Sequence, residues 1–442
     1  MAADTVDVLV VGAGPTGLLL AGDLAAAGVP VTVLERRQGD SDTSRDCVVH
    51  ARTLELLDAR GIADDLIAVG RTVDHLNLFG HIDVDLGRLP SRFGFVLLTP
   101  QHQTERLLAE RARSLGAQII EGMEVNALRP ANEGAHVQAA GAAGKCRTFT
   151  PSFVVGADGA GSIVREMMSL PFLPVDHGEI RETITKMLGT DLSVDAGWLG
   201  RQADERRAPR YRSGPVFLAG DAAHLHAPAG GQGVNAGLQD AANLSWKLAA
   251  MARGTADPRL LDSYQDERHP SGQAALRLSR NLPSVPFFWP LMMRPAARAA
   301  ARPLERASAI ADRIAEAVSG IGAGYLGGRG AHRLAGRRAP DLPLTGVDQC
   351  RLYEALRQGK FILLNGLRRQ DAVSSTAAPW RERVLTAVPR APQVRLSLIR
   401  PDGYIAWASD VTDEAVCGDA LRHELTRWCG TGAVLPLAAA PR

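Results

Sequence analysis

The chain has 442 residues, a formal net charge of +2, 45% hydrophobic residues and 22% charged residues. These values are ordinary for a folded protein of two or three domains, and they exclude the strongly basic surface of a nucleic-acid-binding protein. The five cysteines include no CxxC pair, so neither a metal site nor dithiol chemistry is expected. Their odd number without a secretory signal fits the cytoplasm, and the most apolar later stretch, residues 287–293, is too short to span a membrane.

The first elements along the chain form a βαβ unit. Residues 6–12 are a valine-rich run that ends in glycine, which is typical of a central parallel strand. Apolar residues at helical spacing predict a helix over residues 16–27, which Gly28 ends, and a second strand follows at residues 31–35. The glycine motif at residues 12–17 therefore lies between a strand and a helix, which is the context of a dinucleotide-binding loop.

Each glycine of this motif has a steric role in such a loop. Gly12 permits the tight turn, Gly14 lets a pyrophosphate approach the backbone, and Gly17 lets the helix pack closely on the strand. The helix start then offers free N–H groups and the positive end of the helix dipole to the phosphates. Glu35, at the end of the second strand, can accept hydrogen bonds from the adenosine ribose. A glycine turn without a ligand is the alternative, which this context disfavours.

Two later motifs separate FAD from NAD as the ligand. An Asp-Gly pair at residues 158–159 and a Gly-Asp pair at residues 220–221 each follow a short buried strand, and a glycine-rich loop comes at residues 230–233. In this order, with the motif at residues 12–17, they resemble the class A flavoprotein monooxygenases of the para-hydroxybenzoate hydroxylase group. More narrowly, the chain resembles the aromatic polyketide hydroxylases. This resemblance implies FAD as the cofactor.

The resemblance also implies roles for the acidic residues. In that family the Asp-Gly motif is linked to both FAD and NADPH binding, and the Gly-Asp carboxylate holds the ribityl chain. Asp221 ends a buried strand at the rim of the sheet, where a carboxylate can accept a ribityl hydroxyl. For Asp158, a helix or turn cap is as compatible with the sequence as a cofactor role. The N–H groups of the loop before Asn235 can face the pyrimidine edge of the flavin.

Other residues match the family at single positions. Gln101 falls where the family places a glutamine near the flavin phosphates, and Gln103 is a competing candidate. Arg45 and Arg52 match arginines near the cofactor, with a surface ion pair or a helix cap as the alternative for each. No catalytic residue and no metal ligand is assigned. The cofactor-binding residues predicted in this way are Gly12, Gly14, Pro15, Thr16, Gly17, Glu35, Arg36, Arg45, Gln101, Asp158, Gly220, Asp221, Pro228, Gly231, Gly233, Val234 and Asn235.

The reaction follows from the resemblance as well. NADPH or NADH would act as a transient reductant of FAD, and O2 would then form a flavin C4a-hydroperoxide that gives one oxygen atom to a small aromatic or polyketide substrate. No second GxGxxG motif is present, so the nicotinamide has no nucleotide-binding domain of its own. Two alternatives are other redox tailoring on the same fold and a degenerate FAD-binding homologue that acts as a partner subunit. A homodimer is also compatible with the sequence.

The expected fold class is α/β. It combines an FAD-binding Rossmann-like domain of the GR2 type, a reduced antiparallel substrate sheet, a helical connector and a C-terminal thioredoxin-like domain. The predicted ranges are residues 1–72, 99–170 and 214–285 for the FAD-binding domain, 73–98 and 171–213 for the substrate-binding region, 286–330 for the connector and 331–442 for the C-terminal domain.

The stretch between the two acidic motifs is short. Family members carry a longer segment at the position of residues 160–219, and that segment forms most of their substrate sheet. Here it is expected to hold one helix, at residues 180–187, and a short strand or two. The sequence therefore predicts a complete cofactor site beside a reduced substrate site. In the C-terminal region, strands are expected at residues 360–364, 394–398 and 405–407, and helices at 349–356 and 419–425.

Overall fold

A computed structural model of the chain underlies the description that follows. It describes residues 4–39, 46–78, 82–141, 144, 146–172, 206–225, 231–272, 308–325, 327–328, 330–367, 371–392, 394–411 and 414–432. The helix expected at residues 180–187, most of the proposed substrate-binding region and part of the connector lie outside these residues.

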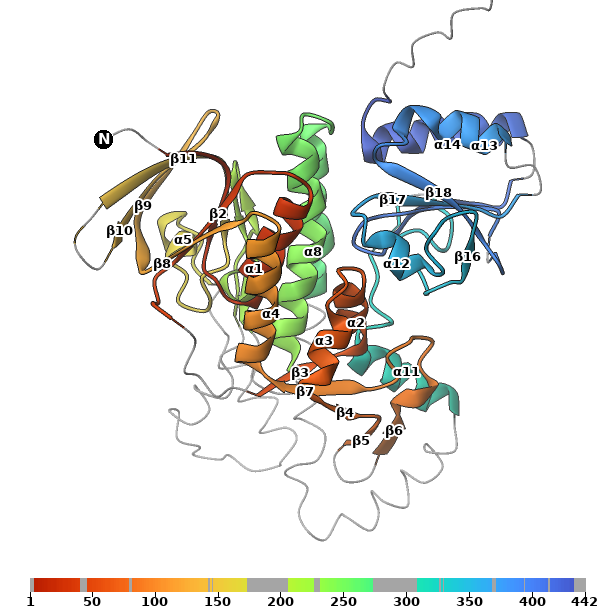
Figure 1. Cartoon of the computed structure of the whole chain (residues 1–442), viewed down its shortest axis with the longest axis horizontal. Helices are drawn as coiled ribbons and strands as arrows, with labels where there is room; N and C mark the ends of the chain where they lie inside the picture. Colours follow the sequence, from red (N-terminus) through yellow and green to blue (C-terminus); the bar gives the residue numbers. More distant parts are fainter. Residues whose placement is uncertain are drawn as a thin grey trace, which may run out of the picture.

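The largest sheet is mostly parallel, as the valine-rich strands predict (Figure 1). Its order is β13-β14-β11-β1-β2-β8, and the β9–β10 hairpin is joined to β11. The pairs β11–β14, β11–β1, β1–β2 and β2–β8 are all parallel, so these five strands end at one edge of the sheet. The strands are β1 (Asp4–Val11), β2 (Val31–Glu35), β8 (Gln118–Glu121), β9 (Met123–Ala131), β10 (Gly134–Gly141), β11 (Cys146–Gly156), β13 (Arg212–Ser213) and β14 (Val216–Leu218).

That shared edge brings the three sequence motifs together. The glycine motif follows β1, the Asp-Gly pair follows β11, and the Gly-Asp pair follows β14, where it forms the short helix η2 (Gly220–Ala222). The ends of parallel strands in an open α/β sheet are the usual position of a ligand. The wide spacing of the motifs in sequence is thus compatible with a single site.

Three helices cover this part of the molecule. Helix α1 (Pro15–Ala26) packs against both α4 (Gln101–Ser114) and α8 (Gln232–Ala252). Leucines of α1 and valines of β1 are fully buried in one continuous core with α8. In Figure 1, α8 runs between the parallel sheet and the C-terminal domain. Its Trp246 contacts Phe361 edge-on at a centroid separation of 5.4 Å, so α8 contributes to the cores of both parts.

A small antiparallel region lies beside the main sheet. Its three-stranded sheet has the order β3-β7-β4, and the β5–β6 hairpin is separate from it among the described residues. Strands β3 and β4 come from either side of the helices α2 and α3 and pair with β7, so this sheet includes segments on both sides of the proposed boundary at residue 72. The elements are β3 (Asp46–Val49), α2 (Ala51–Asp58), α3 (Ala63–Ala68), β4 (Arg71–Val73), β5 (His75–Leu78), β6 (Ile82–Asp85), η1 (Leu86–Arg88) and β7 (Val96–Pro100).

Short elements complete this half of the chain. Strands β12 and β15 pair antiparallel, and α11 packs on β6 and η1. A helical segment over residues 262–272 follows η3. The elements are α5 (Ile163–Met167), β12 (Arg206–Arg207), β15 (His224–Leu225), η3 (Pro258–Leu261) and α11 (Ser308–Ser319).

The C-terminal domain has the thioredoxin-like arrangement that was expected. Its sheet order is β16-β18-β17-β19-β20, in which β17 and β18 are parallel and β19 and β20 are antiparallel. The expected strands and both expected helices are present, whereas β16, β18 and α13 were not predicted. The elements are β16 (Leu344–Thr345), α12 (Leu352–Leu356), β17 (Phe361–Asn365), α13 (Asp371–Ala377), η5 (Ala378–Trp380), β18 (Val384–Pro389), β19 (Leu396–Ile399), β20 (Ile405–Ser409) and α14 (Glu414–Cys429).

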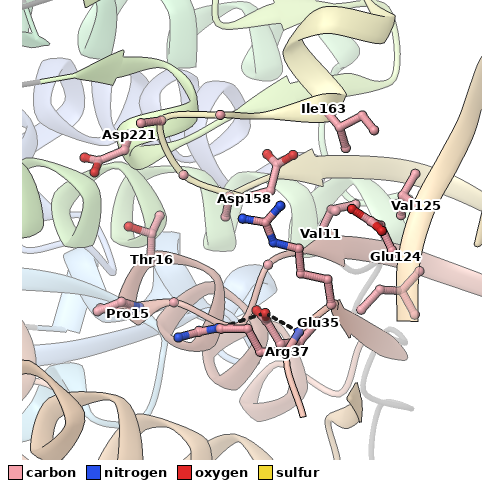
Figure 2. A pocket seen from close by; sticks show the side chains of 18 of the residues that line it. Val11, Pro15, Thr16, Glu35, Arg37, Glu124, Val125, Asp158, Ile163 and Asp221 are labelled. Carbon is pink, nitrogen blue, oxygen red and sulfur yellow. Dashed lines mark hydrogen bonds and ion pairs between the residues drawn. The ribbon is translucent and has the colours of Figure 1, made fainter. Parts of the chain in front are cut away.

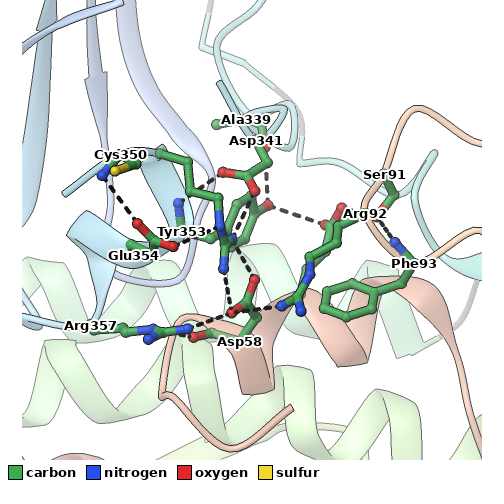
Figure 3. A network of polar contacts seen from close by, with 12 residues as sticks. Asp58, Ser91, Arg92, Phe93, Ala339, Asp341, Cys350, Tyr353, Glu354 and Arg357 are labelled. Atoms are coloured by element: carbon green, nitrogen blue, oxygen red, sulfur yellow. Dashed lines mark hydrogen bonds and ion pairs between the residues drawn. The ribbon is translucent and has the colours of Figure 1, made fainter. Parts of the chain in front are cut away.

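Ion pairs with one deeply buried partner, Asp58 or Arg400, join the two halves, and the pairs of Asp58 are drawn in Figure 3. The carboxylate of Asp58, at the end of α2, accepts hydrogen bonds from Arg351 at 2.6 Å and from Arg357 at 2.8 Å. A second cluster joins Arg400 to Glu267, with N–O distances of 2.6 and 3.0 Å. Removing one partner from such a buried pair leaves an uncompensated charge, so these contacts restrict how the two halves can move apart.

Within the described ranges, no helix is long and apolar enough to cross a bilayer. In the same residues, no group of three or more His, Cys, Asp or Glu side chains is placed to hold a metal ion. The four cysteines that can be described, Cys47, Cys146, Cys350 and Cys429, are free thiols.

Candidate functional site

A cavity of about 570 Å³ lies at the edge where the parallel strands end (Figure 2). That volume is typical of a site for a small molecule or cofactor. Figure 2 shows Asp221 on one side of the cavity, Glu124 and Val125 on the other, and Asp158 between them. The lining residues are Val11, Gly12, Gly14, Pro15, Thr16, Leu34, Glu35, Arg36, Arg37, Gln101, Glu105, Met123, Glu124, Val125, Ala157, Asp158, Gly159, Ala160, Gly161, Ile163, Glu166, Asp221, Gly233 and Val234.

The glycine motif has the steric roles that its sequence context predicts. Gly12 has φ +104°, and a Cβ there would overlap the carbonyl of Ala157. A Cβ on Gly17 would overlap the carbonyl oxygen of Gly12, so α1 lies directly on the turn. A Cβ on Gly14 would meet nothing within 4 Å, because this residue faces the cavity. Gly14 thus leaves space where the other two glycines permit close packing.

Glu35 is held in place by hydrogen bonds from Ala13 and Arg37. One carboxylate oxygen accepts the N–H of Ala13 at 2.7 Å, and the other accepts the backbone N–H and the Nε–H of Arg37, both at 3.0 Å. Burial acts to raise the pKa of Glu35, but these hydrogen bonds outweigh it and lower the pKa below 4.5. Glu35 is therefore an ionised acceptor at neutral pH, at the rim of the cavity.

Asp158 combines the two roles that its sequence left open. Its carboxylate accepts the hydroxyl of Ser162 at 2.6 Å and the N–H of Val164 at 3.2 Å, so it caps the turn that begins α5. The same side chain lines the cavity. Burial raises the pKa of Asp158, against these hydrogen bonds, which act to lower it.

Arg165 connects the loops that carry the two acidic motifs. Its guanidinium donates to the carbonyl of Ala160, after the Asp-Gly pair, at 2.8 Å. It also donates to the carbonyl of Ala222, in the turn after the Gly-Asp pair, at 3.0 Å. Arg165 is only 5% exposed. Its two buried hydrogen bonds therefore hold the two loops in a fixed relation at the cavity wall.

The Gly-Asp turn packs closely on the start of α1. Gly220 has φ +62°, and a Cβ there would lie 2.7 Å from the hydroxyl oxygen of Thr16. A Cβ on Gly237 of α8 would overlap the same hydroxyl. Thr16 therefore lies between the turn and α8, which leaves the backbone next to Asp221 little freedom to shift.

Asn235, in the first turn of α8, connects this helix to strand β3. Its side-chain amide donates to the carbonyls of Val48 and Gly231, both at 2.7 Å, and its oxygen accepts the N–H of His50 at 2.9 Å. Gly231 has φ +68° and precedes α8. These bonds tie the glycine-rich loop to β3, so the described contacts of the Asn235 side chain are to the protein backbone.

Eleven of the predicted cofactor residues line the cavity, counted from its lining. Gly17, Gly220, Gly231 and Asn235 instead pack behind the lining, and Arg45 and Pro228 lie outside the described residues. The residues that line the cavity are Gly12, Gly14, Pro15, Thr16, Glu35, Arg36, Gln101, Asp158, Asp221, Gly233 and Val234.

Of the residues that match the family at single positions, Gln101 lines the cavity, and Gln103 and Arg52 do not. Gln101 lines the cavity and donates to Glu105 at 2.8 Å, whereas the described contacts of Gln103 are with His102 and Arg106. Arg52 is fully buried, and its ion pair with Glu55, at 3.1 Å, lies in the interior rather than at the surface as the alternative had it. It does not line the cavity.

Sequence reasoning missed one wall of the cavity. Met123, Glu124 and Val125 at the start of β9 line it, as do Arg37 and Glu105. These residues reach the cavity because β8 pairs in parallel with β2, so the residues just after β8 lie at the same sheet edge as Glu35. That pairing is a tertiary feature, and the strand prediction alone did not contain it.

The residues around the cavity fit FAD. Helices α1 and α8 both begin at it, and neither start has a side-chain cap or an acidic residue in its first turn. Uncapped N–H groups at a helix start bind phosphate and other negative charge. The carboxylates of Glu35 and Asp221 supply acceptors for hydroxyl groups, and Gly14 leaves room for the ligand at α1.

Comparison with known families agrees with this fit. The FAD binding domain family matches residues 5–202 and 175–279, and the C-terminal domain family of aromatic-ring hydroxylases matches residues 332–432. The chain therefore belongs to the FAD-dependent aromatic-ring monooxygenases, and its cofactor is FAD.

Three similar proteins illustrate the range of the family. YhjG of Bacillus subtilis strain 168, named as an uncharacterized aromatic compound monooxygenase, is 33% identical, with 96% of this chain and 98% of that protein covered. The solved structure of the OxyS anhydrotetracycline hydroxylase from Streptomyces rimosus has a TM-score of 0.81 at 31% identity, with 97% of this chain and 100% of that chain covered. A dialkyldecalin synthase of Streptomyces rugosporus is 31% identical, with 96% of this chain and 99% of that protein covered.

Proposed function

We propose that this chain hydroxylates a small aromatic or polyketide substrate, with O2 as the oxygen source and NADPH or NADH as a transient reductant. The observation that carries the proposal is the cavity on which the three motifs converge, with uncapped starts of α1 and α8 and carboxylates on its walls. The names of similar proteins support the substrate class, because they include an anhydrotetracycline hydroxylase and an uncharacterized aromatic compound monooxygenase.

Different residues of the cavity would bind different parts of FAD. The N–H groups at the start of α1, beside Gly14 and Thr16, would bind the pyrophosphate. Glu35 would accept the ribose hydroxyls, and Asp221 would accept a ribityl hydroxyl. Gly233 and Val234 at the start of α8 would stabilise negative charge on the flavin.

When bound, FAD supplies the reduction and oxygen-activation chemistry, and the protein supplies position and exclusion of water. The sequence holds no second GxGxxG motif, and the described residues form no second sheet of this parallel type beside the one that carries the three motifs. The nicotinamide would therefore bind transiently beside FAD. We propose that the enzyme works in the cytoplasm, either as a homodimer or with a partner subunit that completes the substrate site.

The predicted domain division remains part of this proposal. The alignment with YhjG extends over 492 positions, compared with 442 residues in this chain, so the relative carries at least 50 positions that this chain lacks. We assign that difference to the short segment between the two acidic motifs, where a substrate sheet would be formed. A reduced sheet would leave the flavin more accessible to water, which favours release of hydrogen peroxide over hydroxylation.

One relative supports a second candidate function. A dialkyldecalin synthase is as similar to this chain as the monooxygenases are, and its name describes ring formation rather than oxygen transfer. The same fold could therefore hold FAD while the protein performs other tailoring, or acts as a subunit. Hydroxylation consumes NADPH or NADH, whereas ring formation without oxygen transfer and a subunit role do not.

The visible spectrum of the purified protein, followed by NADPH and NADH oxidation with and without a polyphenolic substrate, tests the proposal. Yellow protein that consumes reductant and forms a hydroxylated product is the expected result. Reductant use that yields only peroxide would indicate an incomplete substrate site. Flavin-loaded protein that consumes no reductant would favour the second candidate, and protein that takes up no FAD would refute the cofactor roles assigned to Glu35 and Asp221.

A further inference from the structure

One buried carboxylate lies directly behind the turn that presents Asp221. Asp240, on α8, is fully buried and does not line the cavity. One of its oxygens accepts the backbone N–H of Gly220 at 3.0 Å and faces His224 Nε2 at 2.6 Å. The other accepts the Nε–H of Arg268 at 2.6 Å. Asp240 therefore connects three separate segments of the chain in the interior.

Its protonation state follows from these partners. Burial acts to raise the pKa of Asp240, but His224 and Arg268 outweigh it and lower the pKa to about 2. An ionised carboxylate can only accept hydrogen bonds, so the Nε2 atom of His224 carries the hydrogen of that bond. All three partners are donors, and no neutral side chain of the same size offers three acceptor positions.

The partners of Asp240 lie on both sides of Asp221. Gly220 immediately precedes it in η2, and His224 follows it at the start of β15. Arg268 holds the carboxylate from the helical segment at residues 262–272, and it also donates to the carbonyl of Ala236 in α8 at 3.2 Å. The turn that carries Asp221 is thus bound to one buried group at each end.

The surrounding packing leaves this turn little alternative geometry. Gly220 has a positive φ and lies against Thr16. Arg165 holds the carbonyl of Ala222 from the other side. A change at Asp240 would therefore act on the direction of the Asp221 side chain rather than on a flexible loop.

We propose that Asp240 is a positioning residue for FAD binding, because it fixes the Gly220–Ala222 turn so that the Asp221 carboxylate points at the cofactor. This inference rests on the proposed role of Asp221 in holding the ribityl chain. Asp240 itself touches neither the cavity nor the cofactor. It acts through the backbone N–H of Gly220, while the Arg268 guanidinium neutralises its charge and His224 donates a hydrogen bond to it.

A matched pair of variants tests this role. Asp240→Asn keeps the shape of the side chain but leaves one acceptor oxygen, with two lone pairs, for three donors. Asp23→Asn removes a comparable buried carboxylate, which is paired with Arg60 and Arg111 and accepts a hydrogen bond from Ser245 of the same helix α8. Asp23 does not line the cavity, so it serves as the control for a loss of stability alone.

Three measurements are made on each protein: the thermal midpoint of the apoprotein, its dissociation constant for FAD, and the visible spectrum and reduction potential of the bound flavin. For Asp240→Asn we expect an FAD dissociation constant about tenfold higher than the wild type and an altered spectrum and potential. For Asp23→Asn we expect a lower midpoint with unchanged FAD binding and an unchanged spectrum. If Asp240→Asn lowers only the midpoint, as the control does, the positioning role is refuted.

A second variant covers failure of Asp240→Asn to fold. His224→Gln keeps the charge of Asp240 and its bonds to Gly220 and Arg268, and it alters the far end of the turn together with the contact of residue 224 with the Tyr211 ring. A higher FAD dissociation constant in folded His224→Gln supports the inference, and an unchanged value overturns it. Asp221→Ala is measured in parallel: if it binds FAD as the wild type does, the proposed role of Asp221 fails, whereas FAD loss in Asp221→Ala with normal binding in Asp240→Asn refutes the positioning role alone.

Discussion

Arg52 donates a hydrogen bond to the hydroxyl of Tyr353 at 2.9 Å, although the two residues are 301 positions apart in the sequence. Arg52 belongs to α2 beside the FAD-binding part, and Tyr353 belongs to α12 of the C-terminal domain. Both are almost fully buried, and Arg52 also donates to the carbonyl of Asp402 at 2.7 Å. The C-terminal domain is therefore joined to the rest of the protein by specific buried polar contacts.

Removing the hydroxyl of Tyr353 is expected to destabilise the protein. The Tyr353→Phe substitution leaves an Arg52 N–H without its acceptor, and it also removes a contact with the carbonyl of Ala339 at 3.0 Å. We expect the free energy of unfolding to fall by about 1–3 kcal/mol, as for other buried hydrogen bonds to a charged group. Urea denaturation followed by circular dichroism measures it.

Tyr404→Phe is the matched control for that substitution. Tyr404 is as buried as Tyr353, and it stacks on Tyr325 at a centroid separation of 4.3 Å, but its hydroxyl has no hydrogen-bond partner within the described structure. We expect a change of no more than about 0.5 kcal/mol, since no hydrogen bond is lost. Equal effects of the two substitutions would contradict a specific role for the Tyr353 hydroxyl.

The two glycines of the first motif should differ in what they disturb. Gly14→Ala adds a methyl group in open space at the cavity, so the apoprotein should keep its stability while the FAD dissociation constant rises about tenfold. Gly17→Ala forces a methyl group into the carbonyl of Gly12, so the apoprotein should lose at least about 2 kcal/mol of unfolding free energy. Thermal melts and FAD titrations of both apoproteins separate these effects. A Gly14→Ala protein that binds FAD normally would exclude close approach of the cofactor at this position.

Weakening Arg165 should release FAD faster. Lysine at position 165 has no planar pair of donors, so it cannot hold both Ala160 and Ala222 in the geometry of the guanidinium. We expect the FAD release rate of Arg165→Lys to rise about tenfold, measured by the recovery of flavin fluorescence after dilution. Arg147→Lys is the control, because Arg147 forms a partly exposed ion pair with Asp4 away from the cavity. Its release rate should match the wild type.

Asp58 should make stability depend on pH in the acid range. Burial acts to raise the pKa of Asp58, but hydrogen bonds from Arg351 and Arg357 outweigh it and lower the pKa below 3.8. The unfolded chain therefore takes up a proton first as the pH falls, so the stabilisation present above about pH 4 is lost as the pH falls through the folded pKa.

Asp58→Asn removes that titration. The difference in unfolding free energy between wild type and Asp58→Asn should be largest near pH 6 and shrink toward pH 3, as urea unfolding at a series of pH values would measure. A difference that stays constant over this range would show that proton uptake by Asp58 does not contribute.

Local sequence determined the parts of the site that depend on backbone geometry. A valine-rich run, a positive-φ glycine and an apolar helical repeat depend on neighbouring residues, so the βαβ unit and all three motifs were predicted. The same local reasoning predicted the α/β class and a separate C-terminal α/β domain, whereas the thioredoxin-like arrangement of that domain was implied by the family resemblance. Local reasoning missed β16, β18 and α13.

Only the tertiary structure decided which side chains meet. No sequence motif marks Asp240, and its three donors come from two segments, the turn at residues 220–224 and the helical segment at residues 262–272, that no local pattern connects to it. Arg52 matched a cofactor arginine by position, yet its guanidinium is used between domains. The wall formed by Met123, Glu124 and Val125 depends on the parallel pairing of β2 with β8. Long-range pairing of this kind is set by the packing of the whole core, so it appears only when all the elements are assembled.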